Sequence, residues 1–199
     1  MDIFDKARQL RQELENAGLD SAALEVFMAL YYNVLDVQPK RPGWPGRDRL
    51  FLNDETLRAA FLAVLADRGY FPAAESESGA PEALPGAEGL CATAAAAAVE
   101  EALRAKEDGD GHLVYAVLSD EDCRRGAVWE SAERASSLGL SRLRFMLCRR
   151  KGGTENICAR FSAFGFATCS ASGGDIEAVT TALEAFCNSS RPVFICCDI

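Results

Sequence analysis

The stretch that decides the fold is His112–Leu118 (HLVYAVL), a short apolar run rich in β-branched and aromatic residues, which is typical of a buried strand. Three similar runs follow it: Leu143–Cys148 (LRFMLC), Phe166–Ala171 (FATCSA) and Pro192–Cys197 (PVFICC). Helical segments are expected at about 126–137 and 175–187, between some of these runs. Strands that alternate with helices predict an α/β fold, in which helices cover both faces of a parallel sheet.

The first half of the chain has mainly helical periodicity. Helices are expected over residues 3–17, about 54–68 and about 92–106. Asp20 or Ser21 can cap a further helix after the first one. The low-complexity stretch 72–88 is interpreted as an exposed loop.

Composition narrows the class of protein. With 199 residues, of which 49% are hydrophobic, the chain is expected to form a single globular domain. The formal charge of −9 argues against nonspecific binding of nucleic acid or of an anionic membrane surface. No apolar run approaches the roughly 18 residues that span a bilayer, and the first residues lack signal-peptide features, so a cytoplasmic protein is expected.

The eight cysteines form no C-x-x-C pair, and the single histidine, His112, is expected at the surface. A zinc site usually shows paired ligands at short spacing, so buried, reduced thiols are the preferred interpretation. Cys123 is the exception, because Arg124 and Arg125 could lower its pKa if it is exposed.

Several motifs, taken in their order along the chain, resemble the transketolase N-terminal, thiamine diphosphate-binding domain family. They are Tyr32-Asn33-Val34-Leu35, Arg47-Asp48-Arg49, Gly69-Tyr70-Phe71, Gly126-x-Val128-Trp129-Glu130, Ala163-Phe164-Gly165-Phe166 and Asp175-Ile176-Glu177-Ala178. They cover nearly the whole chain, which is identified as a degenerate member of that family. The resemblance implies one transketolase N-terminal-like domain over residues 1–199, without the pyrimidine and C-terminal domains.

The resemblance also shows which cofactor residues differ. The family binds thiamine diphosphate through a divalent metal held by the Asp of a G-D-G motif and by an Asn after the next strand. Asp120 matches the Asp, but Glu121 replaces the second Gly and adds bulk where the backbone approaches the phosphates. Arg150 falls on the Asn, and a guanidinium has only donors, so it cannot ligate a cation. Asp120 is therefore the only retained metal-ligand match, and thiamine diphosphate with Mg²⁺ is disfavoured as a cofactor.

Substrate-side motifs of the family are changed as well. The G-S-G-H-P-G-G loop between the first two helices is absent, and Thr56 stands where the family has a substrate-side His. Gly174 replaces the His of G-H-D. The resemblance thus implies a retained fold without the family's chemistry, so no catalytic residue and no metal site are predicted.

Charged residues gather where a ligand would bind, since open α/β sheets bind ligands at the carboxyl ends of their strands. After the first strand come the acidic residues Asp120, Glu121 and Asp122, together with Arg124. After the next strand come the basic residues Arg149, Arg150 and Lys151. They can be ion pairs that close the vacated cofactor site, with Arg150 replacing the metal opposite Asp120. Alternatively, Arg149, Arg150 and Lys151 form a metal-free anion site, or Asp120 supports residual cofactor binding.

Three functions remain open. The first is a noncatalytic, transketolase-like pseudoenzyme that acts as a binding or partner subunit. Its partner would be a second copy, with Trp129 and the Ala-rich helix 92–104 as candidate dimer surfaces, or a pyrimidine-domain transketolase subunit. The second is the N-terminal subunit of a split transketolase, inactive without a separately encoded pyrimidine domain. The third is a small-anion sensor.

Overall fold

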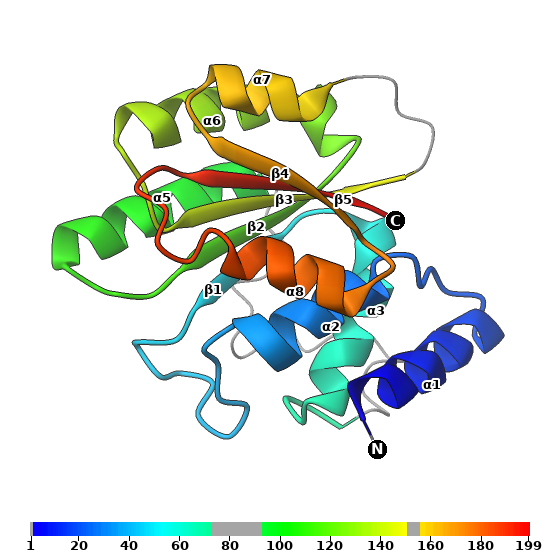
Figure 1. Ribbon diagram of the computed structural model, residues 1–199. Coiled ribbons are helices and arrows are strands. Elements are labelled where there is room, and N and C mark those ends of the chain that lie inside the picture. The colour runs from blue at the N-terminus through cyan, green and yellow to red at the C-terminus, as the bar shows by residue number, and fades with distance from the viewer. Residues whose placement is uncertain (1, 73–92, 151–155) are drawn as a thin grey trace.

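A five-stranded, all-parallel sheet forms the centre of the molecule (Figure 1), with strand order β1-β2-β3-β5-β4. The structure is a computed structural model that describes residues 2–72, 93–150 and 156–199. The strands are β1 (Arg49–Leu52), β2 (Val114–Ser119), β3 (Leu143–Arg149), β4 (Ala167–Ser172) and β5 (Val193–Asp198). The α/β fold and the four expected strands are confirmed. The fifth strand, β1, has only four residues, too few for its alternation to stand out in the sequence.

Helices cover both faces of this sheet (Figure 1). They are α1 (Ile3–Asn16), α2 (Leu24–Ala29) with its π-helical continuation (Leu30–Val34), α3 (Glu55–Asp67), α5 (Ala94–Asp108), a 3₁₀ turn (Asp122–Arg124), α6 (Gly126–Ser137), α7 (Ile157–Ala163) and α8 (Ile176–Glu184). One layer contains α5, α6 and α7. The other contains α2, α3 and α8, with α1 packed outside α2 and α3. The stretch 72–88, expected to be a loop, lies almost entirely outside the described residues.

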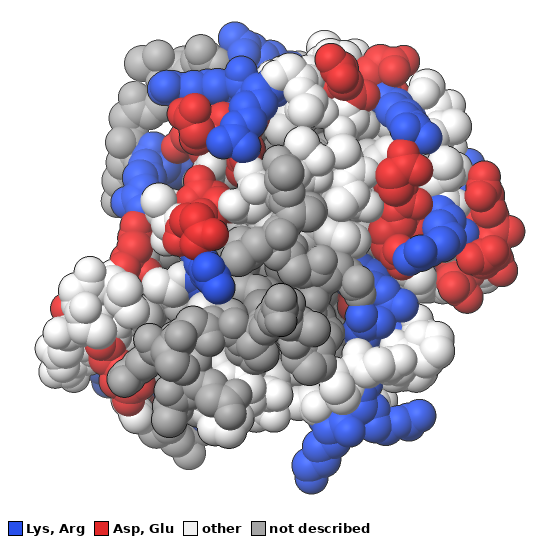
Figure 2. Space-filling model, turned by 180° about the vertical axis from the view of Figure 1, so that it is seen from behind, with Lys and Arg blue, Asp and Glu red and all other residues white. Residues whose placement is uncertain are grey.

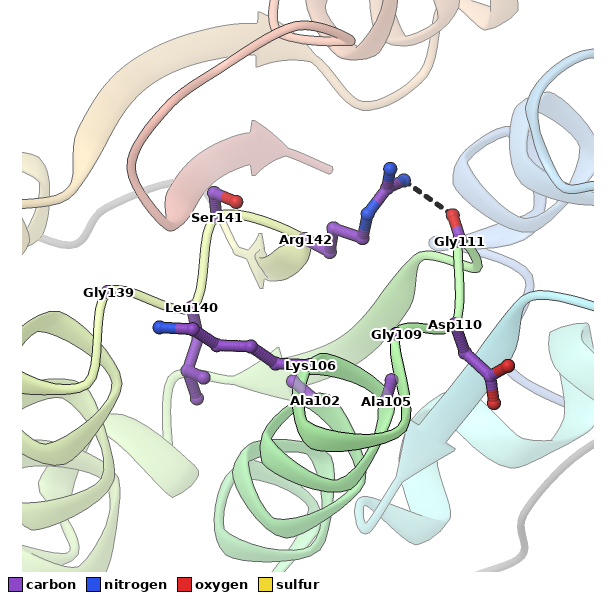
Figure 3. A pocket seen from close by; sticks show the side chains of 10 residues that line it. All are labelled: Ala102, Ala105, Lys106, Gly109, Asp110, Gly111, Gly139, Leu140, Ser141 and Arg142. Atoms are coloured by element: carbon purple, nitrogen blue, oxygen red, sulfur yellow. Dashed lines mark hydrogen bonds between the residues drawn. The ribbon is translucent and has the colours of Figure 1, made fainter.

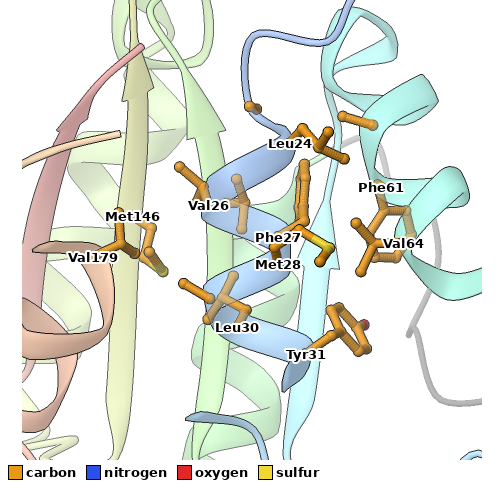
Figure 4. Packing of buried hydrophobic residues seen from close by; sticks show 14 of the residues in the cluster. Leu24, Val26, Phe27, Met28, Leu30, Tyr31, Phe61, Val64, Met146 and Val179 are labelled. Carbon is orange, nitrogen blue, oxygen red and sulfur yellow. The ribbon is translucent and has the colours of Figure 1, made fainter. Parts of the chain in front are cut away.

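The second helix is the most deeply buried one. Every residue of α2 is buried, and the helix lies between α3 and the sheet (Figure 4). Phe27 and Tyr31 pack against Phe61 of α3, with ring centroids 5.3 and 6.0 Å apart. The prediction that Asp20 or Ser21 caps this helix is wrong, because α2 begins at Leu24 and has no side-chain cap. Apart from Glu25, which pairs with Arg11 of α1, the helix is apolar, so packing holds it and it depends less on its cap.

The opposite layer has an aromatic core. Phe161 of α7 stacks on Phe194 of β5 with ring centroids 3.9 Å apart, and it meets Phe145 of β3 edge-on at 6.0 Å. Phe166 completes the cluster, 5.3 Å from Phe161. This packing fixes the short helix α7 across the sheet, although the sequence did not predict it.

Asp48, the centre of the Arg47-Asp48-Arg49 motif, ties together the amino-terminal end of the sheet. Its carboxylate accepts the backbone N–H of Asp36 at 2.9 Å and that of Leu113 at 2.7 Å, and the residue is only 5% exposed. Burial raises the pKa of Asp48, against the lowering effect of these two hydrogen bonds. The motif therefore has a structural role, since it joins the loop before β1 to the start of β2.

His112 lies at the same end of the sheet and is buried, so the prediction of a surface histidine is wrong. Its Nε2 lies 3.2 Å from Oε1 of Glu101, which is buried on α5. Glu101 Oε1 also lies 3.5 Å from Nε of Arg49. Glu101 of α5 is thus a polar partner that allows this histidine to be buried just before β2 begins. Among the described residues, no helix is long and apolar enough to cross a membrane.

Candidate functional site

The carboxyl ends of β1 and β2 are joined by Asp122, which is 4% exposed. Its Oδ2 accepts the backbone N–H of Ser119 at 3.0 Å and the Ser119 hydroxyl at 3.2 Å. Its Oδ1 accepts the Asn53 side-chain amide at 3.0 Å. All of these bonds hold the turn after β2, so Asp122 stabilises the site instead of facing a ligand.

Asp54 has a similar structural role at the start of α3. Its Oδ1 accepts the backbone N–H of Thr56 at 2.7 Å and the Thr56 hydroxyl at 2.6 Å, which caps the helix. Burial opposes ionisation, but hydrogen bonds from Ser119 and Thr56 prevail and lower the pKa of Asp54. Thr56, at the position of the family's substrate-side His, is thus used in the helix cap.

Asp120 and Arg150 meet after β2 and β3, but through the backbone of Arg150. The Arg150 N–H donates to Asp120 Oδ2 at 3.0 Å. The Arg150 guanidinium pairs with Asp20, which lies in the loop between α1 and α2. Asp20 thereby links this loop to the end of β3. That Arg150 replaces a metal opposite Asp120 stays a hypothesis: only its backbone contacts Asp120, and its guanidinium charge faces Asp20.

The Arg149 side chain points away from Asp20 and toward Asp198 of β5. Its Nε and a terminal nitrogen lie 2.7 and 2.6 Å from Asp198 Oδ1, and this hydrogen bonding raises the pKa of Arg149. The cations next to β2 also have carboxylate neighbours, since Arg124 lies 3.8 Å from Glu121 and Arg125 lies 3.6 Å from Asp122.

The predicted anion site of Arg149, Arg150 and Lys151 stays a prediction. Lys151 lies outside the described residues. The other two side chains diverge, because Arg149 pairs with Asp198 and Arg150 pairs with Asp20. An anion would have to compete with these carboxylates for the guanidinium donors.

The oxygen ligands available at these strand ends do not fit the metal ion that holds the diphosphate in the transketolase family. Mg²⁺ and Ca²⁺ need about six or more oxygen ligands. Asp120 offers a carboxylate, but one of its oxygens already accepts the N–H of Arg150. Within the described part of the chain, no group of three His, Cys, Asp or Glu side chains is arranged to hold a metal ion.

Two of the cavities formed by the described residues lie at opposite ends of the sheet. One, of about 260 Å³, is at the amino-terminal end of the sheet (Figure 3), where Lys106 binds the Leu138 carbonyl and Arg142 binds the Gly111 carbonyl. The other, of about 410 Å³, lies beside the carboxyl ends of β4 and β5 and includes Ser170 and Asp198 in its wall. Only the second adjoins residues of the strand ends at which α/β sheets bind ligands.

The surface seen from behind carries interspersed charges (Figure 2). Arg134 and Glu100, on neighbouring helices α6 and α5, form one of the ion pairs of the described residues, at 2.6 Å. The charged side chains coloured on this face are mixed in sign and do not form one basic area.

The two candidate dimer surfaces are partly used within the chain. Trp129 stacks on Phe164 at 6.0 Å, packs on Phe161 at 5.0 Å and donates its indole N–H to the Cys123 carbonyl at 2.9 Å. Helix α5 buries one side against β1 and β2, while Glu100, Arg104 and Glu107 stay exposed. Cys123, which could have been a reactive thiol if exposed, is buried.

Solved structures with the same fold are transketolases. The solved transketolase of Campylobacter jejuni superposes on the whole chain with a TM-score of 0.83 at 24% identity, and the chain spans 38% of that transketolase. The transketolase of Leishmania mexicana also matches the whole chain, with a TM-score of 0.78. The chain therefore has the α/β fold of the transketolase N-terminal domain.

Sequence comparisons agree with the fold. The 6-deoxy-6-sulfo-D-fructose transketolase subunit of Clostridium sp. is 28% identical over 193 residues, covering 85% of this chain and 70% of the relative. An apulose-4-phosphate transketolase subunit of Actinobacillus succinogenes is 26% identical, covering 89% of this chain and 73% of the relative. No family model matches. In sequence and in fold the chain is therefore similar to transketolase N-terminal domains and to proteins described as transketolase subunits.

The residues that sequence reasoning missed are Asp20 and Asp198, the acidic partners of the two arginines. The sequence indicates Asp20 only as a possible helix cap and does not single out Asp198. No local signal connects them to Arg150 and Arg149, because these contacts join residues 130 and 49 positions apart.

Proposed function

We propose that this chain is a noncatalytic partner subunit of a two-chain assembly of the transketolase type. In this assembly a separately encoded protein would supply the pyrimidine domain. The chain would contribute the transketolase N-terminal-like fold without holding a metal-bound diphosphate itself. The similarity to proteins described as transketolase subunits supports the division into two chains.

The observation that carries the noncatalytic part is the contact of Arg150 with both Asp120 and Asp20. Its backbone N–H occupies an oxygen of the one retained metal-ligand match, and its guanidinium ties down the α1–α2 loop. A residue with donors only cannot supply the second oxygen ligand at this position. Contacts within the chain therefore stabilise the strand ends at the place where the transketolase family would hold a metal ion.

A second candidate is the N-terminal subunit of a catalytically active split transketolase. It is favoured by the names of the relatives, one a 6-deoxy-6-sulfo-D-fructose transketolase subunit and another an apulose-4-phosphate transketolase subunit. In this case Asp120 would take part in cofactor binding once a partner is present. The two candidates differ in whether the assembly binds thiamine diphosphate through this chain.

Calorimetric titration tests the noncatalytic part of the proposal. Purified protein is titrated with thiamine diphosphate in the presence and absence of Mg²⁺, and we expect no saturable heat at millimolar ligand. The double variant Arg150→Asn with Glu121→Gly should gain weak, Mg²⁺-dependent binding, whereas Arg8→Asn, at an exposed arginine of α1, should not. Tight, metal-dependent binding by the wild type would refute the ligand-loss argument and favour the second candidate.

Co-expression with a pyrimidine-domain transketolase subunit from the same genome tests the assembly. Sedimentation velocity should show a complex of the two chains, and titration of that complex should show whether this chain adds a cofactor site. A complex whose thiamine diphosphate binding is unchanged by Asp120→Ala supports the proposal. Loss of binding in that variant supports the active split enzyme, and a chain that forms only homodimers contradicts both.

A further inference from the structure

A pair of thiols lies outside the cofactor-side cluster, where α7 crosses β5. Cys158 is in the first turn of α7, and Cys196 lies near the carboxyl end of β5, opposite Ser170 in the β4–β5 register. Both carry free thiols. Cys158 is partly exposed, while Cys196 is fully buried beneath the α5–α7 layer.

The two thiols belong to a continuous polar chain. The Cys158 Sγ lies 3.6 Å from Ser170 Oγ and 3.8 Å from the Cys169 carbonyl oxygen, and Ser170 is paired with Cys196 in the β4–β5 register. Cys196 Sγ lies 3.9 Å from Asp198 Oδ1, the oxygen that also binds Arg149. The open cavity of about 410 Å³ has Ser170 and Asp198 in its wall, so small reagents can approach this chain.

The surrounding groups give the two thiols different acidities. The hydrogen bond with Cys196 lowers the pKa of Cys158 to about 6, assisted by Ser170 and by the positive charge of Arg149. Burial and Asp198 act in the opposite direction. The hydrogen bond to Cys158, together with burial, raises the pKa of Cys196. These opposite shifts favour the thiolate form on Cys158 and the thiol form on Cys196.

A second pair of neighbouring cysteines in the same sheet shows that proximity alone does not create this arrangement. Cys148 and Cys197 face each other across β3 and β5, on the side covered by α2 and α8. Both are at most 2% exposed, and burial raises the pKa of Cys148 and brings that of Cys197 to about 12. They pack as small apolar side chains.

We propose that Cys158 and Cys196 form a redox-modification site, in which Cys158 reacts with low-molecular-weight disulfides and Cys196 resolves the product into an intramolecular disulfide. The Cys158 thiolate attacks one sulfur of the reagent, which breaks the reagent's S–S bond and releases one thiolate. Cys196 then loses its proton, through Asp198 to solvent, and attacks the Cys158 sulfur, which releases the second thiolate. Two protein thiols are oxidised by two electrons, and one reagent disulfide is reduced to two thiols.

The product would link the start of α7 covalently to β5. Oxidation and reduction would then change how firmly this helix is held, next to the Arg149–Asp198 ion pair at the sheet edge. Reversible disulfides of this kind in reducing compartments are usually catalytic or redox-sensing.

The test uses oxidised glutathione as the reagent and the full chain as the protein. After exposure, remaining thiols are blocked at acidic pH, and the protein is digested without reduction and mapped by tandem mass spectrometry, which separates Cys196 from Cys197. We expect a peptide pair joined through Cys158 and Cys196. Cys196→Ser should leave glutathione on Cys158, Cys158→Ser should leave Cys196 unmodified, and Cys187→Ser, at an exposed cysteine, should not change the result.

Alkylation kinetics on the wild type give an independent measurement that does not depend on a cysteine variant. With a thiol pKa of about 6, Cys158 should react with iodoacetamide roughly five-fold faster at pH 6.5 than an ordinary peptide thiol, since higher thiolate content outweighs lower nucleophilicity. Arg149→Gln should move the midpoint of the rate profile to higher pH. The proposal is overturned if Cys158 stays unmodified while Cys187 reacts, or if its glutathione adduct persists in the wild type.

Discussion

The two ends of the parallel sheet are held by different kinds of contact. At the amino-terminal end, residues that match the transketolase pattern still make buried structural contacts, as Asp48 does with the N–H groups of Asp36 and Leu113. At the carboxyl-terminal end, the contacts are ion pairs that are partly exposed to solvent, as between Arg150 and Asp20. The amino-terminal end therefore depends on buried hydrogen bonds, and the carboxyl-terminal end on partly exposed ion pairs.

Residues of other matching motifs also have structural roles, and one of them lies at the carboxyl-terminal end of the sheet. Gly69, of Gly69-Tyr70-Phe71, has a φ of +83° just after α3, and Asp175, of Asp175-Ile176-Glu177-Ala178, caps α8 by accepting the N–H groups of Glu177 and Ala178. These residues would be needed with or without a cofactor. Motif residues with such structural roles indicate the fold and carry no information about activity.

The largest expected effect is that of Asp48→Ala. This change leaves two backbone N–H groups without their acceptor at a buried position, so we expect a loss of about 2–4 kcal/mol in the free energy of unfolding. Urea denaturation followed by circular dichroism measures it. Asp120→Ala, at the other end, should cost less than about 1 kcal/mol because one partly exposed acceptor is lost. Equal losses in both variants would remove the distinction between the two ends.

A pair of glycines gives a second, smaller contrast. Gly165, just before β4, has a φ of +93°, and a Cβ there would lie 2.5 Å from Ser136 Oγ. The serine can rotate, so backbone strain dominates, and Gly165→Ala should cost about 1–2 kcal/mol. Gly174, after β4, has open space around it, and Gly174→Ala should change stability by less than about 0.5 kcal/mol. Thermal unfolding of the two variants side by side would expose any reversal of this order.

The buried histidine allows a pH test of the amino-terminal end. Burial and the charge of Arg49 lower the pKa of His112 below 6.5, although Asp110 and Asp48 act in the opposite direction. Between the folded and unfolded pKa values the unfolded chain binds more protons, so this group's stabilisation is present above pH 6.5 and is lost as the pH falls. Because the chain has one histidine, its imidazole proton signals can be followed by NMR titration. A midpoint above 6.5 would mean that Glu101 dominates instead.

The sequence predicted the fold well because the strands are short, buried apolar runs with strong periodic contrast to the helices. It failed where tertiary contacts override a local pattern. Helix α2 has no side-chain cap because it is buried on every side, and His112 is buried because Glu101 of α5 gives it a polar partner. For the site, it placed Asp120 beside Arg150, since parallel strands end at one edge. It could not supply the partners Asp20, Asp198 and Cys196, which come from distant parts of the chain.

The smallest effect on stability is expected at the carboxyl-terminal end, for Asp20→Asn. The Arg150–Asp20 ion pair is partly exposed to solvent, and such pairs contribute little, so the free energy of unfolding should change by less than about 0.5 kcal/mol. The same variant should instead loosen the α1–α2 loop, which hydrogen–deuterium exchange of residues 17–23 can detect. Faster exchange with unchanged stability would mean that Arg150 and Asp20 act locally, closing the strand ends without supporting the fold. A loss of stability comparable to that of Asp48→Ala would instead make the carboxyl-terminal end as structural as the amino-terminal end.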